Sequence, residues 1–126
     1  MDRNVIATDK APGAAGPYSQ GVVGEGLVFT AGMMGLDPKT GQLVSEDVGD
    51  QTRQALTNLQ SILEAAGSSL DRAVKITVFL TDIGAFSQMN AAYTEFFPSD
   101  PPARTTVEVG PLPKGGLVEI DAIALR

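Results

Sequence analysis

The sequence predicts an α+β domain in which two helices pack on one face of a six-stranded mixed sheet. Apolar residues alternate along several short segments, as in half-buried strands, and recur every three or four positions along two longer ones, as in amphipathic helices. The predicted order of elements is β-ββ-α-β-α-ββ, which is an α+β arrangement. At 126 residues, the chain is expected to form a single domain over residues 1–126.

The first part of the chain is predicted to be extended. Residues 4–8 (NVIAT) form a short strand, and a loop rich in Gly and Pro, KAPGAAGP, follows it. The segments YSQGVV and LVFTAG flank the tripeptide GEG, which indicates a β-hairpin. A further turn is expected in GLDPKTGQL, where Pro and Gly stand at turn spacing.

A helix from Asp47 to about Ala66 is the most clearly marked element. Ser45 or Asp47 is placed to cap its start, and Gly67 stands where a helix usually ends. Its apolar stripe, at spacings of three and four, consists of Val48, Thr52, Ala55, Leu56, Leu59, Ile62, Leu63 and Ala66.

A second helix is expected from about Ala85 to Phe97, because Pro98 cannot continue it. Its stripe consists of Phe86, Met89, Tyr93 and either Phe96 or Phe97. The segment AVKITVFLTD before it predicts a strand with alternating faces.

Two strands, RTTVEV and LVEIDAIAL, close the chain and are expected to pair with each other because they are close in sequence. This pairing would bring Arg104 near Glu119.

Two helices cover only one face of such a sheet, while the other face keeps apolar side chains that another layer must cover. Since no element remains in the chain, the sequence predicts an obligate homo-oligomer.

Composition excludes several kinds of chemistry. The chain contains no cysteine and no histidine, so thiolate nucleophiles, disulfides, Cys/His zinc sites and Ser–His–Asp triads are ruled out. The net charge is −6 and no run of basic residues occurs, which argues against a nucleic-acid partner. The N-terminal segment lacks the apolar core of a secretory signal, and no segment is long enough to span a bilayer, so a cytoplasmic location is expected.

Arg104 opens a predicted half-buried strand, where a permanent cation needs a partner. One interpretation is a structural ion pair with Glu119 or Glu108. The other is a guanidinium that binds a substrate carboxylate through two parallel hydrogen bonds. The residues alone leave both interpretations open.

The segment PPARTTVEVGPLPKGGLVEIDAIAL resembles the C-terminal signature of the reactive-intermediate deaminase (RidA/YjgF) family. GPYSQGV, FTAGMMGLDPKTGQL, QTRQALTNLQSILEAAGSSLDRAVKITVFLTDIGAF and MNAAYTEFF agree with that family in the same order. The resemblance implies a chorismate-mutase-like fold and a homotrimer with sites between adjacent subunits. It also implies hydrolysis of 2-imino acids, such as 2-iminopropanoate, to 2-oxo acids and ammonia, without a metal or an organic cofactor.

The resemblance assigns roles to individual residues. Arg104 matches the carboxylate-binding arginine, and Glu119 matches the acid associated with the hydrolytic water. Tyr18 matches an aromatic residue that lines the pocket, Gly32 a glycine whose backbone faces the substrate, and Asn90 a helical asparagine near the site. The reaction would also use the Thr106 hydroxyl to bind the leaving nitrogen. Other interpretations remain: a packed aromatic for Tyr18, a strand end for Gly32 and a solvated position for Asn90.

The chain departs from the family pattern at several positions. Many relatives carry Ser-Gly-Gln where this chain has Ala31, Gly32 and Met33, and many carry cysteine at Thr106, so regulation through a thiol is excluded here. Two alternative functions stand beside the deaminase. One is a non-catalytic sensor that binds 2-oxo acids in the same Arg104 pocket; the other is an RNA-directed ribonuclease or translation inhibitor, as some members of the family are described.

Overall fold

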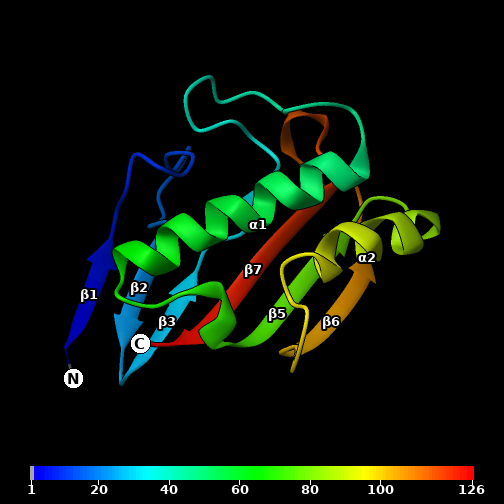
Figure 1. Ribbon diagram of the computed structural model, residues 1–126. Coiled ribbons are helices and arrows are strands. Elements are labelled where there is room, and N and C mark those ends of the chain that lie inside the picture. The colour runs from blue at the N-terminus through cyan, green and yellow to red at the C-terminus, as the bar shows by residue number, and fades with distance from the viewer. Residues whose placement is uncertain (1) are drawn as a thin grey trace.

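The computed structural model describes residues 2–126, which form one mixed β-sheet with two α-helices packed on one of its faces (Figure 1). This confirms the predicted α+β arrangement. The strands are β1 (Arg3–Ile6), β2 (Gly21–Gly24), β3 (Leu27–Thr30), β4 (Met33–Met34), β5 (Ala73–Leu80), β6 (Ala103–Glu108) and β7 (Val118–Leu125). The helices are α1 (Val48–Ala65) and α2 (Phe86–Thr94), and short 3₁₀ turns occupy η1 (Leu70–Arg72), η2 (Ile83–Ala85) and η3 (Pro113–Gly115).

The sheet differs from the prediction in strand number and order. Within residues 2–126 it has seven strands rather than six, in the order β1-β2-β3-β7-β5-β6, with β4 paired to β7. The additional strand, β4, is only two residues long, too short to show an alternating pattern. The predicted pairing of the last two strands is wrong: β5 lies between them, and β6 runs parallel to β5. The connection through α2 permits this, since parallel neighbours need a crossover.

Helix α1 forms as its sequence predicts. The side chain of Asp47 caps it by accepting a hydrogen bond from the backbone N–H of Asp50, at 2.9 Å. Gly67 follows the helix with φ +81°, a conformation that favours glycine at this position. The helix buries its apolar stripe against the sheet, and five of its apolar side chains are fully inaccessible: Ala55, Leu56, Leu59, Ile62 and Leu63.

Two further predictions are settled by backbone geometry. The hairpin between β2 and β3 turns at Glu25 and Gly26, which both have positive φ, as a two-residue type I′ turn requires. Helix α2 is shorter than expected, because a 3₁₀ turn precedes it and its C-terminal end tightens. There the N–H groups of residues 95–97 bond to carbonyls three residues earlier, so the stretch up to Phe97 is not regular α-helix.

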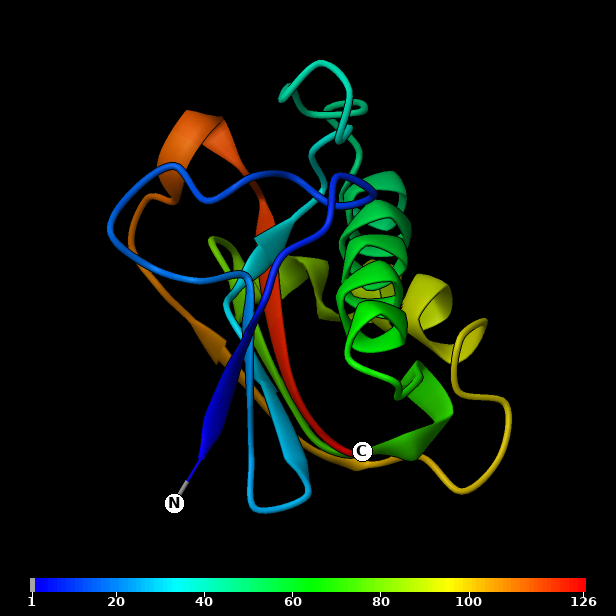
Figure 2. The same ribbon diagram turned by 90° about the vertical axis from the view of Figure 1, so that its left-hand side faces the viewer.

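Within residues 2–126, neither α1 nor α2 covers the opposite face of the sheet (Figure 2). Along β7, Ile120 and Ala122 are buried beneath the helices, whereas the alternating residues on the other face are only half-buried. Phe29 and Val107 on that face are 44% and 39% exposed. The predicted open apolar face is therefore present. Across the described range, no helix has the length and apolarity to cross a bilayer.

Asn58 joins α1 to the segment after β4. Its side chain is fully buried, and its Nδ2 group donates to the carbonyl oxygens of Met34, at 3.1 Å, and Leu36, at 2.9 Å. This contact sets the path of residues 34–36, which line the cavity described below.

We predict that Asn58→Ala lowers the free energy of unfolding by about 2 kcal/mol, because it leaves buried carbonyl groups unpaired. Thermal unfolding at one fixed protein concentration measures the change. Thr57→Ala, on the exposed side of the same helix, is the control and should change stability by less than about 0.5 kcal/mol. Equal melting temperatures for both variants would contradict the assigned role of Asn58.

Candidate functional site

The sequence-predicted site residues fall into two groups on opposite faces of the sheet. Arg104 pairs with Ile76 in the register between β6 and β5, and Ile76 is fully buried under the helices, so Arg104 lies on the helix-covered face. Glu119 pairs with Phe79 on the same central strand and lies on the open face. Arg104 and Glu119 of one chain are therefore separated by the sheet itself.

Arg104 lies against aromatic rings rather than carboxylates. Its Cζ atom is 4.6 Å from the ring centroid of Tyr93 and 5.4 Å from that of Phe86, both on α2. The ion pairs found within residues 2–126 involve Arg53 instead, with Asp50 and Glu95. The structural ion pair considered for Arg104 is therefore absent from the described chain, and its guanidinium keeps its capacity to bind an anion.

Polar atoms without partners lie on the elements that flank Arg104. Asn90 Oδ1, the Tyr93 hydroxyl and Thr106 Oγ1 are buried and have no hydrogen-bond partner among the described residues. Leaving such a group dry costs about 1–3 kcal/mol, so atoms of this kind commonly mark a ligand or water site. Burial raises the pKa of Tyr93, and the positive charge of Arg104 opposes that shift. A cavity of about 410 Å³ adjoins this group, lined by Arg104, Tyr93 and Pro-rich residues 98–102.

Glu119 lies in a different cavity, of about 340 Å³. Its walls come from residues 12–18, residues 32–41, the η3 turn and Glu119 itself. The Nζ atom of Lys114 in η3 donates to the carbonyl oxygen of Gly41 at 2.6 Å and so ties two of these walls together. Tyr18 is half-exposed at the rim, where its hydroxyl accepts a hydrogen bond from the N–H of Ala15 at 3.2 Å.

Gly32 and Glu119 are in close contact. A Cβ atom at Gly32 would lie 2.8 Å from Cδ of Glu119, closer than real Cβ contacts. Only glycine therefore leaves room for the carboxyl group at its observed position. The structure thus brings Tyr18, Gly32 and Glu119 to one cavity. Arg104 lines a different cavity with Tyr93, while Asn90 lies on α2 and Thr106 on β6.

Two carboxyl groups on the open face have perturbed acidity. Burial raises the pKa of Glu119, and the negative charge of Asp121 raises it further. Burial also raises the pKa of Asp121, while a hydrogen bond from Thr77 and the positive charge of Lys75 act against that shift. A carboxyl group with a raised pKa is a better proton acceptor than an ordinary glutamate, as a general base requires.

Sequence reasoning missed several residues that the structure places beside the predicted ones. Phe86 and Tyr93 were assigned to the apolar stripe of α2, yet they contact the guanidinium of Arg104. The seven-residue spacing of these two aromatic residues is visible in the sequence, but it is just as typical of a helix that packs against a core. Lys114 carried no signal in the sequence, because its partner Gly41 lies 73 positions away. Asp121 stands two residues from Glu119 on β7, so the alternation of the strand could have marked it as a neighbour of Glu119.

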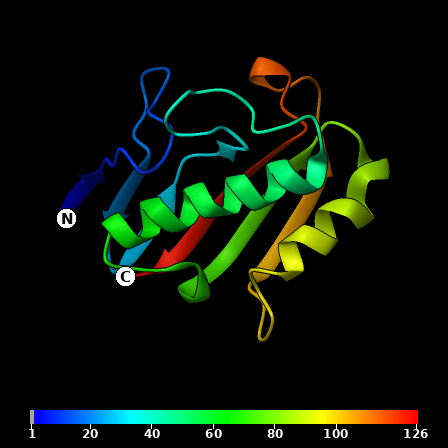
Figure 3. The same cartoon turned by 45° about the horizontal axis from the view of Figure 1, so that its top comes forward.

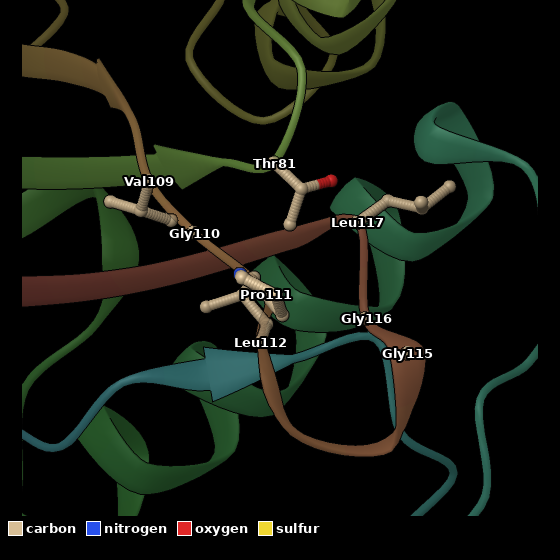
Figure 4. Close-up of a pocket in the computed structure, with 8 residues that line it drawn as sticks. All are labelled: Thr81, Val109, Gly110, Pro111, Leu112, Gly115, Gly116 and Leu117. Carbon is tan, nitrogen blue, oxygen red and sulfur yellow. The ribbon is translucent and has the colours of Figure 1, made fainter.

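A third cavity, of about 360 Å³, lies between the end of β5 and the loop that precedes β7 (Figure 4). Its walls include Thr81, Val109, Pro111, Leu117 and several glycines, and none of its lining residues carries an ionisable side chain. Proton-transfer chemistry is therefore not expected there. In the range that the structure describes, no group of three His, Cys, Asp or Glu side chains is arranged to hold a metal ion.

Comparisons of this chain with family models, curated proteins and solved structures all point to one protein family. The family model described as Endoribonuclease L-PSP, the model of the RidA/YjgF proteins, matches residues 8–126. The chain belongs to this family. It is 48% identical to the 2-iminobutanoate/2-iminopropanoate deaminase of Bos taurus, across 98% of this chain and 90% of that protein. It is 45% identical to Reactive Intermediate Deaminase A, chloroplastic, of Arabidopsis thaliana, across 98% of this chain and 66% of that protein.

Solved structures of the RidA/YjgF family share the fold. The crystal structure of E. coli TdcF with bound serine superimposes with a TM-score of 0.92 at 44% identity, covering 98% of both chains. RidA from the Antarctic bacterium Psychrobacter sp. PAMC 21119 gives a TM-score of 0.93 at 42% identity, covering 98% of this chain and 99% of that one. The arrangement of two helices on a mixed sheet is thus the family's arrangement.

The raised pKa of Glu119 predicts how stability depends on pH. The folded state holds this proton more tightly than the unfolded chain, so protonation of Glu119 stabilises the fold. That contribution is complete below the unfolded pKa, near 4.5, and is lost as the pH rises through the higher folded value. Glu119→Gln should therefore weaken the fall in melting temperature between about pH 4 and about pH 8.

The exposed Glu64→Gln is the matched control for this experiment, because it makes the same chemical change on the outer surface of α1. Thermal unfolding across the pH series, at constant protein concentration, provides the measurement. A Glu119→Gln variant with the same pH profile as wild type would contradict the predicted shift.

Proposed function

We propose that the protein hydrolyses reactive 2-imino acids, such as 2-iminopropanoate, to 2-oxo acids and ammonia. The observation that carries the proposal is a half-buried arginine without a carboxylate partner in its own chain, beside buried polar atoms that also lack partners. Relatives at 45–48% identity are named imine or reactive-intermediate deaminases. TdcF, a solved relative, holds serine, an amino acid that presents the same carboxylate group.

The proposed site is shared between copies of the chain in a chorismate-mutase-like homotrimer. Arg104 and Glu119 lie on opposite faces of one sheet, so a site that uses both needs Arg104 from one copy and Glu119 from another. The open face, with Phe29 and Val107 exposed, is an apolar surface for such a contact. A contact between different patches of identical chains repeats, and a closed ring is its simplest bounded form.

The proposed reaction needs only binding and proton transfer. Arg104 holds the substrate carboxylate by two parallel hydrogen bonds and so fixes the C=N group relative to the water. Glu119 accepts a proton from the water as its oxygen bonds to C2, while the π electrons of the C=N bond move to nitrogen. Glu119 then returns that proton to the nitrogen, the hydroxyl proton follows it as the C=O bond forms, and the C–N bond breaks to release ammonia. No step uses a metal or an organic cofactor.

The remaining residues would complete the pocket. The backbone at Gly32 and the Thr106 hydroxyl face the departing nitrogen, Asn90 adds a polar contact on the Arg104 side, and Tyr18 covers the entrance. Ala31 and Met33 offer no hydroxyl or amide where many relatives carry them; Met33 borders the Glu119 cavity, and Ala31 packs against the core. The cytoplasmic location remains a prediction of the sequence.

A sensor that binds 2-oxo acids without turnover is the second candidate. The lack of a hydroxyl and an amide at Ala31 and Met33 favours it, because fewer polar groups remain to act on the substrate. The assay below separates the two functions. A ribonuclease activity is disfavoured by the net charge of −6, and cleavage of single-stranded RNA by the purified protein would revive it.

We expect Arg104→Ala to lower kcat/KM for 2-iminopropanoate by about 100-fold or more, because the carboxylate loses its charged hydrogen bonds. A PLP-dependent serine dehydratase generates the imine in situ, and pyruvate release is followed. Arg53→Ala, which removes the arginine of the exposed ion pairs, is the control and should match wild type. Equal acceleration by wild type and Arg104→Ala would overturn the proposal.

Gly32→Ala should lower kcat by roughly tenfold or more with little change in fold, because the added methyl group displaces the Glu119 carboxyl group. The same coupled assay measures the effect. Gly24→Ala is the matched control, since a Cβ atom there meets nothing within 4 Å. If both alanine variants were fully active, Glu119 would not act from its observed position.

A further inference from the structure

Two aromatic rings on α2 lie against the guanidinium of Arg104. Phe86 and Tyr93 are seven residues apart, so they lie two turns apart on the same side of the helix. Their ring centroids are 5.4 Å and 4.6 Å from the Cζ atom of Arg104, within the range of cation–π contact. Both strand β6 and helix α2 therefore contribute to one unit, formed by Arg104, Phe86 and Tyr93.

The rings differ in how firmly they are held. Tyr93 is only 5% exposed and packs on the ring of Phe97, with centroids 4.6 Å apart. Phe86 is 38% exposed, although it is a large apolar side chain on a short helix. The contact with Tyr93 is therefore the more shielded of the two. Cation–π contacts are stronger where water is excluded, so Tyr93 should contribute more than Phe86.

Within the described chain, the side-chain hydrogen bonds and ion pairs involving arginine belong to Arg53, Arg72 and Arg126. Arg104 is thus held mainly by aromatic contacts, with no carboxylate partner among the described residues. An arginine side chain that moves freely loses about 2 kcal/mol of rotamer entropy when a ligand fixes it. Contacts that hold the side chain beforehand reduce that loss.

We propose that Phe86 and Tyr93 are positioning residues that hold Arg104 ready for a planar carboxylate. A cation–π contact gives the guanidinium no hydrogen-bond acceptor from the ring, so its N–H groups stay available, and a carboxylate can bind two of them in one plane. The inference deepens the proposed function, on which it rests for the identity of the ligand. Tyr93 acts on Arg104 through its ring, and its hydroxyl group, which has no hydrogen-bond partner in the described chain, stays available to a ligand or a water molecule.

Variants at both positions separate the effect of the aromatic ring on binding from the effect of the Tyr93 hydroxyl group and from the effect of side-chain packing. Tyr93→Leu removes one ring and should weaken binding of 2-oxobutanoate, a 2-oxo acid of the same class as the product, by about tenfold. Phe86→Leu should weaken it by about threefold, because that ring is more exposed. Phe86→Trp keeps a ring and should bind within about twofold of wild type, whereas Tyr93→Phe keeps the ring without the hydroxyl group and should bind more tightly than Tyr93→Leu.

Calorimetry with 2-oxobutanoate measures affinity without turnover, and the coupled imine assay gives KM and kcat. The positioning role predicts that the leucine variants raise KM while kcat stays within about twofold of wild type, with rescue by the ring-bearing variants. Phe86→Leu keeps the test decisive if Tyr93→Leu does not fold, because Phe86 lies partly in solvent.

The outcomes separate this inference from the proposed function. Binding of 2-oxobutanoate by wild type without imine hydrolysis would remove the deaminase and leave the positioning role intact. Leucine variants that bind as tightly as wild type, or ring-bearing variants that bind as weakly as the leucine variants, would overturn the positioning role.

Discussion

The structure depends on one constraint: the sheet is covered by helices on one face only. Side chains alternate along each strand, so neighbouring residues of β6 and β7 are directed either beneath the helices or onto the open face. Arg104 belongs to the first set and Glu119 to the second, with β5 between their strands. The chain thus carries a cation and an acid that it cannot bring together, which explains why they do not pair with each other and why the proposed site uses a second copy.

Each half of the site is built by contacts between segments far apart in sequence. On the open side, Lys114 bonds to Gly41 across 73 positions, and the absence of a side chain at Gly32 admits the Glu119 carboxyl group. On the helix side, α2 places Tyr93 against Arg104. Figure 3 shows how α1 and α2 lie side by side over the sheet, with α2 above the edge formed by β5 and β6. The chemistry of each half therefore follows from the order of the strands.

Local patterns predicted the elements well and their partners poorly. The cap at Asp47, the stripe of α1 and the turn at Gly26 are set by neighbours within a few positions, and the structure agrees with each. The pairing of the last two strands was wrong because closeness in sequence does not outweigh the crossover through α2. The resemblance to a known family supplied the candidate residues, but not their division between two faces. That division, and the rings beside Arg104, depend on long-range packing that no local pattern encodes.

A mixing experiment tests the shared site most directly. Arg104→Ala and Glu119→Gln chains are purified separately, unfolded, mixed in equal amounts and refolded, and native mass spectrometry verifies mixed assemblies. If one copy supplies Arg104 and its neighbour supplies Glu119, random pairing restores an intact site at about one quarter of the contacts, with that share of wild-type activity. Mixed assemblies that stay as inactive as either variant alone would contradict the account.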